Sequence, residues 1–220
     1  MSPSGSPPRG SSRLPTPFGT DVRYWAPAIA VSLTTFVIVV NASLMNVAIP
    51  TMVAEFDTTV TVIQGAVAGY SLVIAALILP AGTLPSRRST RRVMAVALVV
   101  YAGGTVVAAI SWNTAILYLG WAFIEGAAAA VLFPLTYTVL TVSYADDDRA
   151  TAFGLLAGIS GLGSTLGPII GGALTTYASW RWGFALQLVG VAVILYFVQY
   201  VTPKPLSDSG SSLDKGGTVL

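Results

Sequence analysis

Cysteine and histidine are both absent from this chain of 220 residues. Without cysteine there is no disulfide framework, thiol nucleophile or thiolate metal site, and without histidine the usual zinc sites and general bases are excluded as well. Charge is also scarce, since only 9% of residues are charged, against about a quarter in soluble domains. A Gly-x-x-x-x-Gly-Lys-[Ser/Thr] loop is missing, which argues against a nucleotide-driven pump. We therefore expect no enzyme activity, cofactor, metal or nucleic-acid partner.

Apolar sequence is abundant, at 54% of residues with a mean hydropathy of +0.76. It is gathered into six segments, each near the roughly 20 residues that cross about 30 Å of hydrocarbon. The segments are residues 27–48, 62–81, 93–110, 115–142, 152–175 and 182–201. The sequence therefore predicts an all-α membrane protein in which residues 26–201 form a bundle of six transmembrane helices within the lipid bilayer.

The basic residues predict the orientation of this bundle, because positively charged loops are retained on the cytoplasmic side. If the N-terminus is inside, only Arg181 of the 11 Lys and Arg residues lies outside. We expect a multi-pass protein of the cell membrane, plasma or inner, with both termini cytoplasmic. Residues 1–25 are rich in Ser, Pro and Gly and are predicted to be a disordered cytoplasmic arm. A secretory signal is disfavoured because the apolar run that follows is too long.

Glycine is concentrated in the fifth segment, where it would be costly in a soluble helix. In lipid, small residues let helix backbones approach closely, so glycine stripes mark packing faces. One stripe consists of Gly163, Gly167 and Gly171, and a second, about half a turn away, consists of Gly154, Gly158 and Gly161. Pro168 is expected to kink or loosen the helix near its end. This helix is therefore predicted to contact neighbours on two sides.

The spacing of these residues resembles the fifth-helix antiporter signature of major facilitator exporters. All six fixed positions match, and they are Gly154, Gly163, Gly167, Pro168, Gly171 and Gly172. The resemblance implies the N-terminal six-helix half of a transporter. The alternative reading of the glycines is a tightly packed transmembrane helix without that role.

The first and second segments resemble the fourteen-helix drug:proton antiporter branch of the same superfamily. Asn41 stands where that branch usually has an acidic residue, and an asparagine cannot carry a proton; the alternative role is hydrogen bonding between helices. The loop after the second segment resembles the superfamily's cytoplasmic gating signature, although Ser86 replaces its aspartate. The resemblance implies a weakened gate, and the alternative is a topological anchor of arginines. The matching loop positions are Gly82, Leu84, Arg87 and Arg91.

Glu125 is the only ionisable residue deep within a predicted span, and no span contains a basic residue. A charge at the bilayer centre costs about 2.5 to 3.5 kcal/mol, so this side chain must be protonated, hydrated or paired. Its surroundings resemble the exporters' Arg-x-x-Gln-Gly motif, with Gly126 matching, Glu125 in the glutamine position and Ala122 in the arginine position. Two hypotheses remain open. Glu125 is either the protonatable site of the transporter or a permanently neutral substitute for glutamine.

Three further polar side chains are predicted to line the proton or substrate pathway. Tyr118 and Thr136 share a helical face with Glu125, and Gln187 occupies an inward polar position in the sixth segment, after a Trp-Arg-Trp entry that resembles the family's. The C-terminal residues 202–220 are predicted to be a cytoplasmic linker. They end in a loose Leu-Asp-x-x-Gly resemblance to the opening of a seventh helix, so a truncated helix is an alternative.

Together these features predict half of a proton-coupled exporter of small amphipathic compounds or drugs. The expected partners are the bilayer, a small-molecule substrate, protons and a second six-helix half, which is either a missing C-terminal half or another copy. The alternative is a non-transporting membrane scaffold or interaction protein derived from such a half.

Overall fold

The computed structural model of the chain describes residues 22–82 and 89–201. Most of the expected N-terminal arm, residues 83–88 of the expected gating loop and the expected linker 202–220 lie outside this part. The elements are α1 (Val22–Glu55), α2 (Val60–Gly82), α4 (Thr90–Ala109), α5 (Thr114–Leu117), the π-helix η1 (Tyr118–Glu125), α6 (Gly126–Ser143), α7 (Asp146–Tyr177) and α8 (Arg181–Val198).

The six predicted spans are confirmed as helices long and apolar enough to cross a membrane. The fourth span is composite, because α5, η1 and α6 follow one another without a break. Several helices extend beyond the apolar runs: α1 continues past Ala48 to Glu55, and α7 is 32 residues long and passes through Pro168. Hydropathy locates only the apolar part of a helix, whereas the backbone hydrogen bonds continue into polar sequence at both ends.

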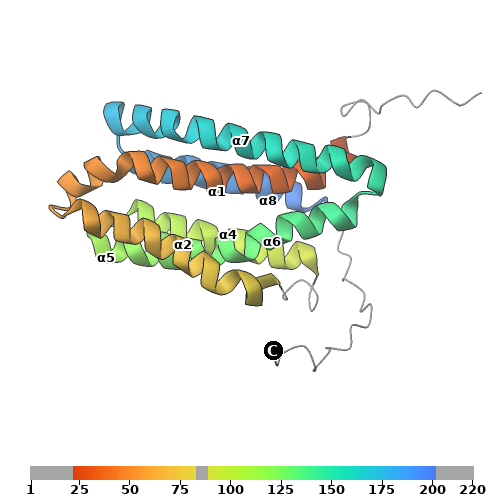
Figure 1. The fold of residues 1–220 in the computed structure, drawn as a ribbon, viewed down its shortest axis with the longest axis horizontal. Helices are drawn as coiled ribbons and strands as arrows, with labels where there is room; N and C mark the ends of the chain where they lie inside the picture. Colours follow the sequence, from red (N-terminus) through yellow and green to blue (C-terminus); the bar gives the residue numbers. More distant parts are fainter. Residues whose placement is uncertain (1–21, 83–88, 202–220) are drawn as a thin grey trace, which may run out of the picture.

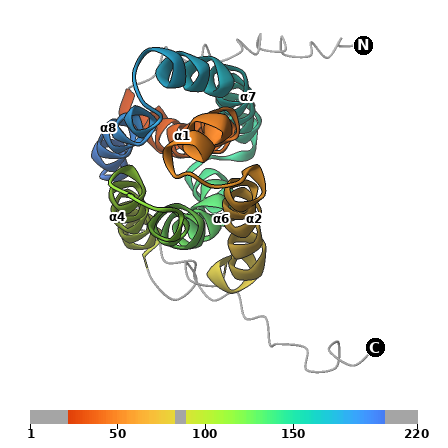
Figure 2. The ribbon, with the colours of Figure 1, turned by 90° about the vertical axis from the view of Figure 1, so that its left-hand side faces the viewer.

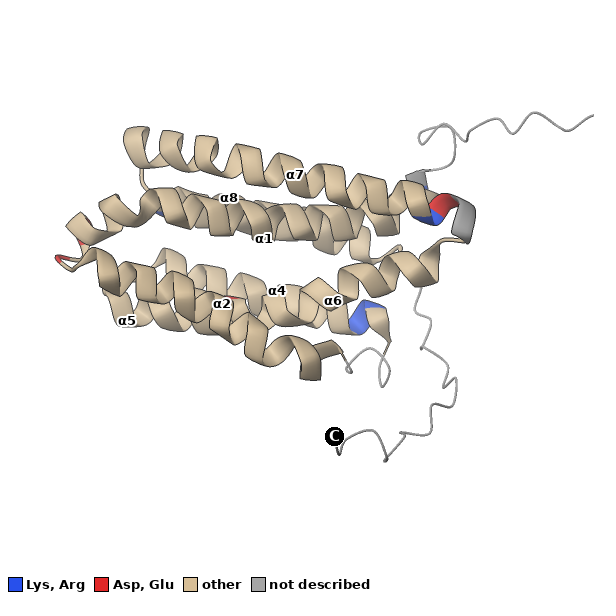
Figure 3. Cartoon of the chain, in the orientation of Figure 1, with Lys and Arg blue, Asp and Glu red and all other residues tan. Residues whose placement is uncertain are grey.

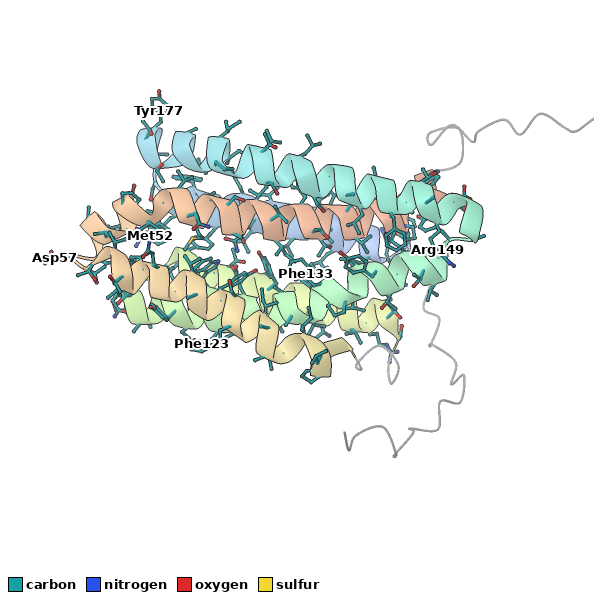
Figure 4. The ribbon with its side chains drawn as sticks, viewed as in Figure 1. Met52, Asp57, Phe123, Phe133, Arg149 and Tyr177 are labelled. Atoms are coloured by element: carbon teal, nitrogen blue, oxygen red, sulfur yellow. The ribbon has the colours of Figure 1, made fainter. Side chains whose placement is uncertain are left out.

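The helices are arranged in two layers (Figures 1 and 2). One layer contains α1, α7 and α8, and the other contains α2, α4 and α6 together with α5 and η1. Charged residues gather at the ends of the helices (Figure 3), and among the described residues Glu125, inside the fourth span, is the exception. Figure 4 places Asp57 and Tyr177 at one end of the bundle and Arg149 at the other. We refer to these as the Asp57 end and the Arg149 end.

The first glycine stripe of α7 packs directly on α1. A Cβ atom added to Gly167 would lie 2.5 Å from Ser43 Cβ, and one added to Gly171 would lie 3.1 Å from Leu44 Cα. At the positions of the second stripe, Gly154, Gly158 and Gly161, an added Cβ would meet nothing within 4 Å among the residues described. Within the described bundle, α7 is therefore held through one of its two glycine faces, and the other is open.

Each end of the bundle is fastened by side chains from different helices. At the Asp57 end, Glu55 accepts a 2.5 Å hydrogen bond from Trp180 Nε1 and forms an ion pair with Arg181, which also donates to the Ser111 carbonyl at 2.5 Å. These contacts join the end of α1 to the beginning of α8 and to the turn after α4.

At the Arg149 end, the Tyr144 hydroxyl joins α1 to the turn between α6 and α7. It donates to the Tyr24 carbonyl at 3.0 Å and accepts from the Ala28 amide at 3.1 Å. The ring also stacks on Trp25, with ring centroids 5.3 Å apart. Burial raises the pKa of Tyr144 to about 12, so its hydroxyl stays protonated and can donate at physiological pH.

Candidate functional site

Four polar side chains meet inside the bundle where α1, α4, η1 and α8 come together. Asn41 Nδ2 donates to Glu125 Oε2 at 2.7 Å and to the Tyr101 hydroxyl at 3.1 Å. The Tyr101 hydroxyl in turn donates to Gln187 Oε1 at 3.2 Å. All four side chains are buried, and Asn41 and Glu125 are 0% exposed. We call Asn41, Tyr101, Glu125 and Gln187 the polar cluster.

The position of Glu125 is set by a close approach between α4 and η1. A Cβ atom added to Gly104 would lie 2.7 Å from the Gly120 carbonyl and 2.9 Å from Glu125 Cγ, and one added to Gly120 would lie 2.5 Å from the Ala108 amide. Larger residues at these two positions would therefore separate the helices. Glu125 is also the last residue of η1, and π-helical turns are rare and frequent at functional sites.

In the polar cluster, the acidic side chain of Glu125 has no cationic partner among the residues described. Among the residues described, the carboxyl of Glu125 pairs with neutral Asn41 rather than with lysine or arginine. Glu125 Oε1, Asn41 Oδ1 and Gln187 Nε2 are also buried without a hydrogen-bond partner among those residues. Buried polar groups are nearly always paired, so three such atoms in one cluster identify a site whose hydrogen bonding is incomplete.

The other residues predicted for the pathway lie apart from this cluster. Tyr118 donates to the Val62 carbonyl at 2.6 Å and so joins η1 to α2. Thr136 is buried but donates to the Phe133 carbonyl at 2.7 Å within its own helix. The prediction that Tyr118 and Glu125 share a helical face assumes 3.6 residues per turn, and this period does not hold across the π-helix η1. The pathway roles of Tyr118 and Thr136 stay predictions.

The predicted gating loop is described only at its two ends. Gly82 is the last residue of α2 and is exposed, and Arg91 is exposed in the first turn of α4. Leu84 and Arg87 lie outside the described residues, as does Ser86. The gating role therefore stays a prediction.

Tyr101 was not anticipated from the sequence. It is the central residue of the polar cluster, since it contacts both Asn41 and Gln187. The signal that could have found it is a tyrosine in the middle of a span, three residues before Gly104, which is where a helix neighbour comes closest. Tyr70 and Trp121 lie nearby as a buried stacked pair, with ring centroids 5.1 Å apart and planes at 5°.

A six-helix membrane bundle with an ionisable cluster in its interior is the architecture of half a membrane transporter. The sequence pattern of the Major Facilitator Superfamily matches residues 31–218. The chain belongs to this superfamily, whose members are transporters and not enzymes.

Among curated relatives, the efflux pump dotC of Dothistroma septosporum is 30% identical over 87% of this chain and 34% of its own length. The puromycin resistance protein pur8 of Streptomyces alboniger is 26% identical over 92% of this chain and 40% of its own length. The riboflavin transporter RibZ of Clostridioides difficile is 24% identical over 89% and 43%. The chain thus spans between a third and a half of the length of these relatives.

Solved structures show the same fold at low sequence identity. A bacterial homologue of the human lysosomal transporter Spinster, in an inward-facing and unoccupied conformation, matches with a TM-score of 0.72 and 15% identity, over 90% of this chain and 48% of that one. The peptide transporter POT in complex with sulfate matches with a TM-score of 0.71 and 17% identity, over 83% and 38%. These similarities support the fold and carry no inference about the substrate.

Proposed function

We propose that this chain forms the N-terminal half of a proton-coupled exporter of small amphipathic compounds, and that Glu125 is the group that takes up and releases the proton. The observation that carries the proposal is the 2.7 Å contact between a fully buried carboxyl group and a neutral amide, with no cationic partner among the described residues. Relatives that are named as efflux pumps and resistance proteins favour export over uptake.

Two opposing effects keep both protonation states of Glu125 accessible. Burial in the hydrocarbon region disfavours the carboxylate by about 2.5 to 3.5 kcal/mol on the insertion scale. The Asn41 N–H group stabilises the carboxylate in return, because hydrogen bonds to charged groups contribute about 1.5 to 3 kcal/mol. A lysine or arginine in place of Asn41 would keep Glu125 permanently ionised, and an apolar residue would keep it permanently protonated. The neutral Asn41 amide therefore suits a carboxyl group that must both bind and release a proton.

The cluster also contains a hydrogen-bond acceptor for the protonated form of Glu125. A protonated Glu125 gains an O–H donor, and Asn41 Oδ1 is a buried acceptor that lacks a partner among the described residues. A proton on Glu125 could therefore be matched by a rotation of the Asn41 amide, which would release its contact with Tyr101. This chain of contacts links the charge of Glu125 to Gln187 on α8.

Transport by this mechanism requires a second six-helix half. Transporters of this kind hold substrate near the membrane midplane between two bundles that move against each other. The open glycine stripe of α7 and the largely exposed α2 are the surfaces of this bundle that are free to receive it. The partner is either a C-terminal half or another copy of this chain. The predicted orientation, with both termini cytoplasmic, belongs to this proposal.

The test uses this chain together with its second six-helix half in proteoliposomes, with a pH-sensitive dye inside and ethidium as the transported probe. Glu125→Gln should abolish ethidium-driven proton movement without changing the amount of folded protein. Asp57→Asn is the matched control, since it removes an exposed carboxylate between α1 and α2, outside the polar cluster. Unchanged proton coupling in Glu125→Gln would show that Glu125 is a neutral glutamine substitute and not the proton site.

A second candidate function is a membrane scaffold that has lost transport. Asn41 and Ala122 occupy positions that are usually charged in the resembling exporters, which favours this alternative. Folded protein that binds a second bundle but moves neither protons nor dye in the same vesicles would support it.

A further inference from the structure

A hollow lies between α4 and α6, and none of the four residues of the polar cluster lines it. It has a volume of about 810 Å³. Apart from Ser89 and Arg92 its lining is apolar, with valines and alanines from both helices, including Ala95, Ala127 and Ala128. Val96 and Val100, which border it, are 63% and 42% exposed, so the groove is open along its length.

The groove ends in positive charge. Arg92 and Ser89 line it at the beginning of α4, and a second hollow of about 460 Å³ shares these two residues and adds Arg91. Both arginines are exposed, and neither is paired with an acidic side chain among the residues described. The first turn of α4 contains no acidic residue that could offset these charges. The positive end of the helix dipole makes the two arginines still less favourable there, so an anion at this position would be stabilised.

The dimensions match one leaflet of a bilayer. From Arg92 to Val100 the helix rises by about 12 Å, at about 1.5 Å per residue, and half of the hydrocarbon core is about 15 Å thick. A molecule that fits must therefore have an anionic group at the membrane surface and an apolar chain of about one leaflet's depth. Basic pockets between transmembrane helices are known to bind anionic lipid headgroups.

We propose that the groove between α4 and α6 is a binding site for an anionic phospholipid. The phosphate of the headgroup pairs with Arg91 and Arg92, and one acyl chain lies along the alanines and valines of the groove. A zwitterionic phospholipid has the same chains but carries a compensating cation in its headgroup, which the two arginines would repel. The site shares Arg91 with the predicted gating loop but contains no residue of the polar cluster, so it does not rest on the proposed role of Glu125.

The experiment is native mass spectrometry of the full-length protein, delipidated in detergent, with phosphatidylglycerol, phosphatidylethanolamine or phosphatidylcholine added at equal concentration. Phosphatidylglycerol should be retained preferentially. Two interfacial arginines at about 1 kcal/mol each predict that Arg91→Gln with Arg92→Gln weakens its binding by about thirtyfold. Ala127→Phe keeps both charges but fills the groove, and should also displace the lipid.

The matched control is Arg23→Gln, which removes a positive charge from the same end of the protein but from α1, outside the groove. It should leave binding unchanged. An equal loss in this control, equal retention of all three lipids, or full binding by Ala127→Phe would overturn the proposal. Displacement of the lipid by glycerol 3-phosphate alone would also overturn it, because the site would then recognise a soluble phosphate. If the double variant does not fold, Arg91→Gln and Arg92→Gln singly should each give a partial loss.

Discussion

Removal of the Tyr101 hydroxyl tests the polar cluster most directly, because this one atom contacts both Asn41 and Gln187. In Tyr101→Phe, Gln187 Oε1 loses its donor at 3.2 Å, and one N–H of Asn41 loses its acceptor at 3.1 Å. Both groups stay buried, since the ring that covers them is retained. The variant therefore leaves two additional buried polar groups without partners and changes almost no apolar packing.

The size of the effect follows from two bounds. A buried group left without its hydrogen bond costs about 1 to 3 kcal/mol in soluble proteins. Hydrogen bonds between membrane helices average about 0.6 kcal/mol, because the unfolded chain in the membrane also finds partners. For two contacts, these bounds predict that Tyr101→Phe lowers the free energy of unfolding by about 1 to 6 kcal/mol.

Tyr70→Phe is the matched control, because the Tyr70 hydroxyl is also buried but has no hydrogen-bond partner among the described residues. Its removal should be neutral or slightly stabilising. The measurement is unfolding of the purified protein in mixed micelles with increasing dodecyl sulfate, followed by circular dichroism. If Tyr101→Phe is no less stable than Tyr70→Phe, the hydrogen bonds of Tyr101 to Asn41 and Gln187 do not stabilise the folded bundle.

Two further predictions concern packing and pH. Gly167→Ala should lower the free energy of unfolding by about 1 to 3 kcal/mol, because its Cβ would lie 2.5 Å from Ser43 Cβ on α1. Gly158→Ala, whose Cβ would meet nothing within 4 Å among the described residues, should not destabilise the protein in the same dodecyl sulfate unfolding measurement, and equal effects of the two variants would contradict the packing of α7. Burial raises the pKa of Tyr144 from 10.0 to about 12, so this hydroxyl ionises at lower pH in the unfolded chain than in the folded protein. The free energy of unfolding should therefore fall as the pH rises from 10 to 12, and Tyr144→Phe should lack this part of the fall. An identical pH profile in the variant would show that Tyr144 is not the group responsible.

The fold could be predicted from the sequence because its main constraint is local. Each span must satisfy its own backbone in lipid, so long apolar runs become helices wherever they occur. The packing role of Gly167 could be predicted for a similar reason, since a four-residue glycine repeat defines a face of a helix. What the pattern could not give was the helix that this face would meet.

The polar cluster could be predicted only in part. Glu125, Asn41 and Gln187 were each singled out as polar residues within apolar spans, yet they are 62 to 146 residues apart in sequence and nothing in the sequence joins them. The sequence did not predict the π-helix η1, which closely approaches Gly104 of α4. Its altered turn places Tyr118 against α2, although a regular helix would have placed it with Glu125.

The cluster lies at the boundary between the two helix layers, which gives a change of charge on Glu125 a structural consequence. Asn41 and Gln187 belong to the layer of α1, α7 and α8, whereas Tyr101 and Glu125 belong to the layer of α2, α4 and α6 (Figure 2). Each of the three hydrogen bonds of the cluster therefore joins one layer to the other. Protonation of Glu125 replaces an acceptor with a donor in this boundary, so the contacts that must rearrange are those that hold the layers together. The two layers are accordingly the parts of this bundle whose relative position we expect the proton to control.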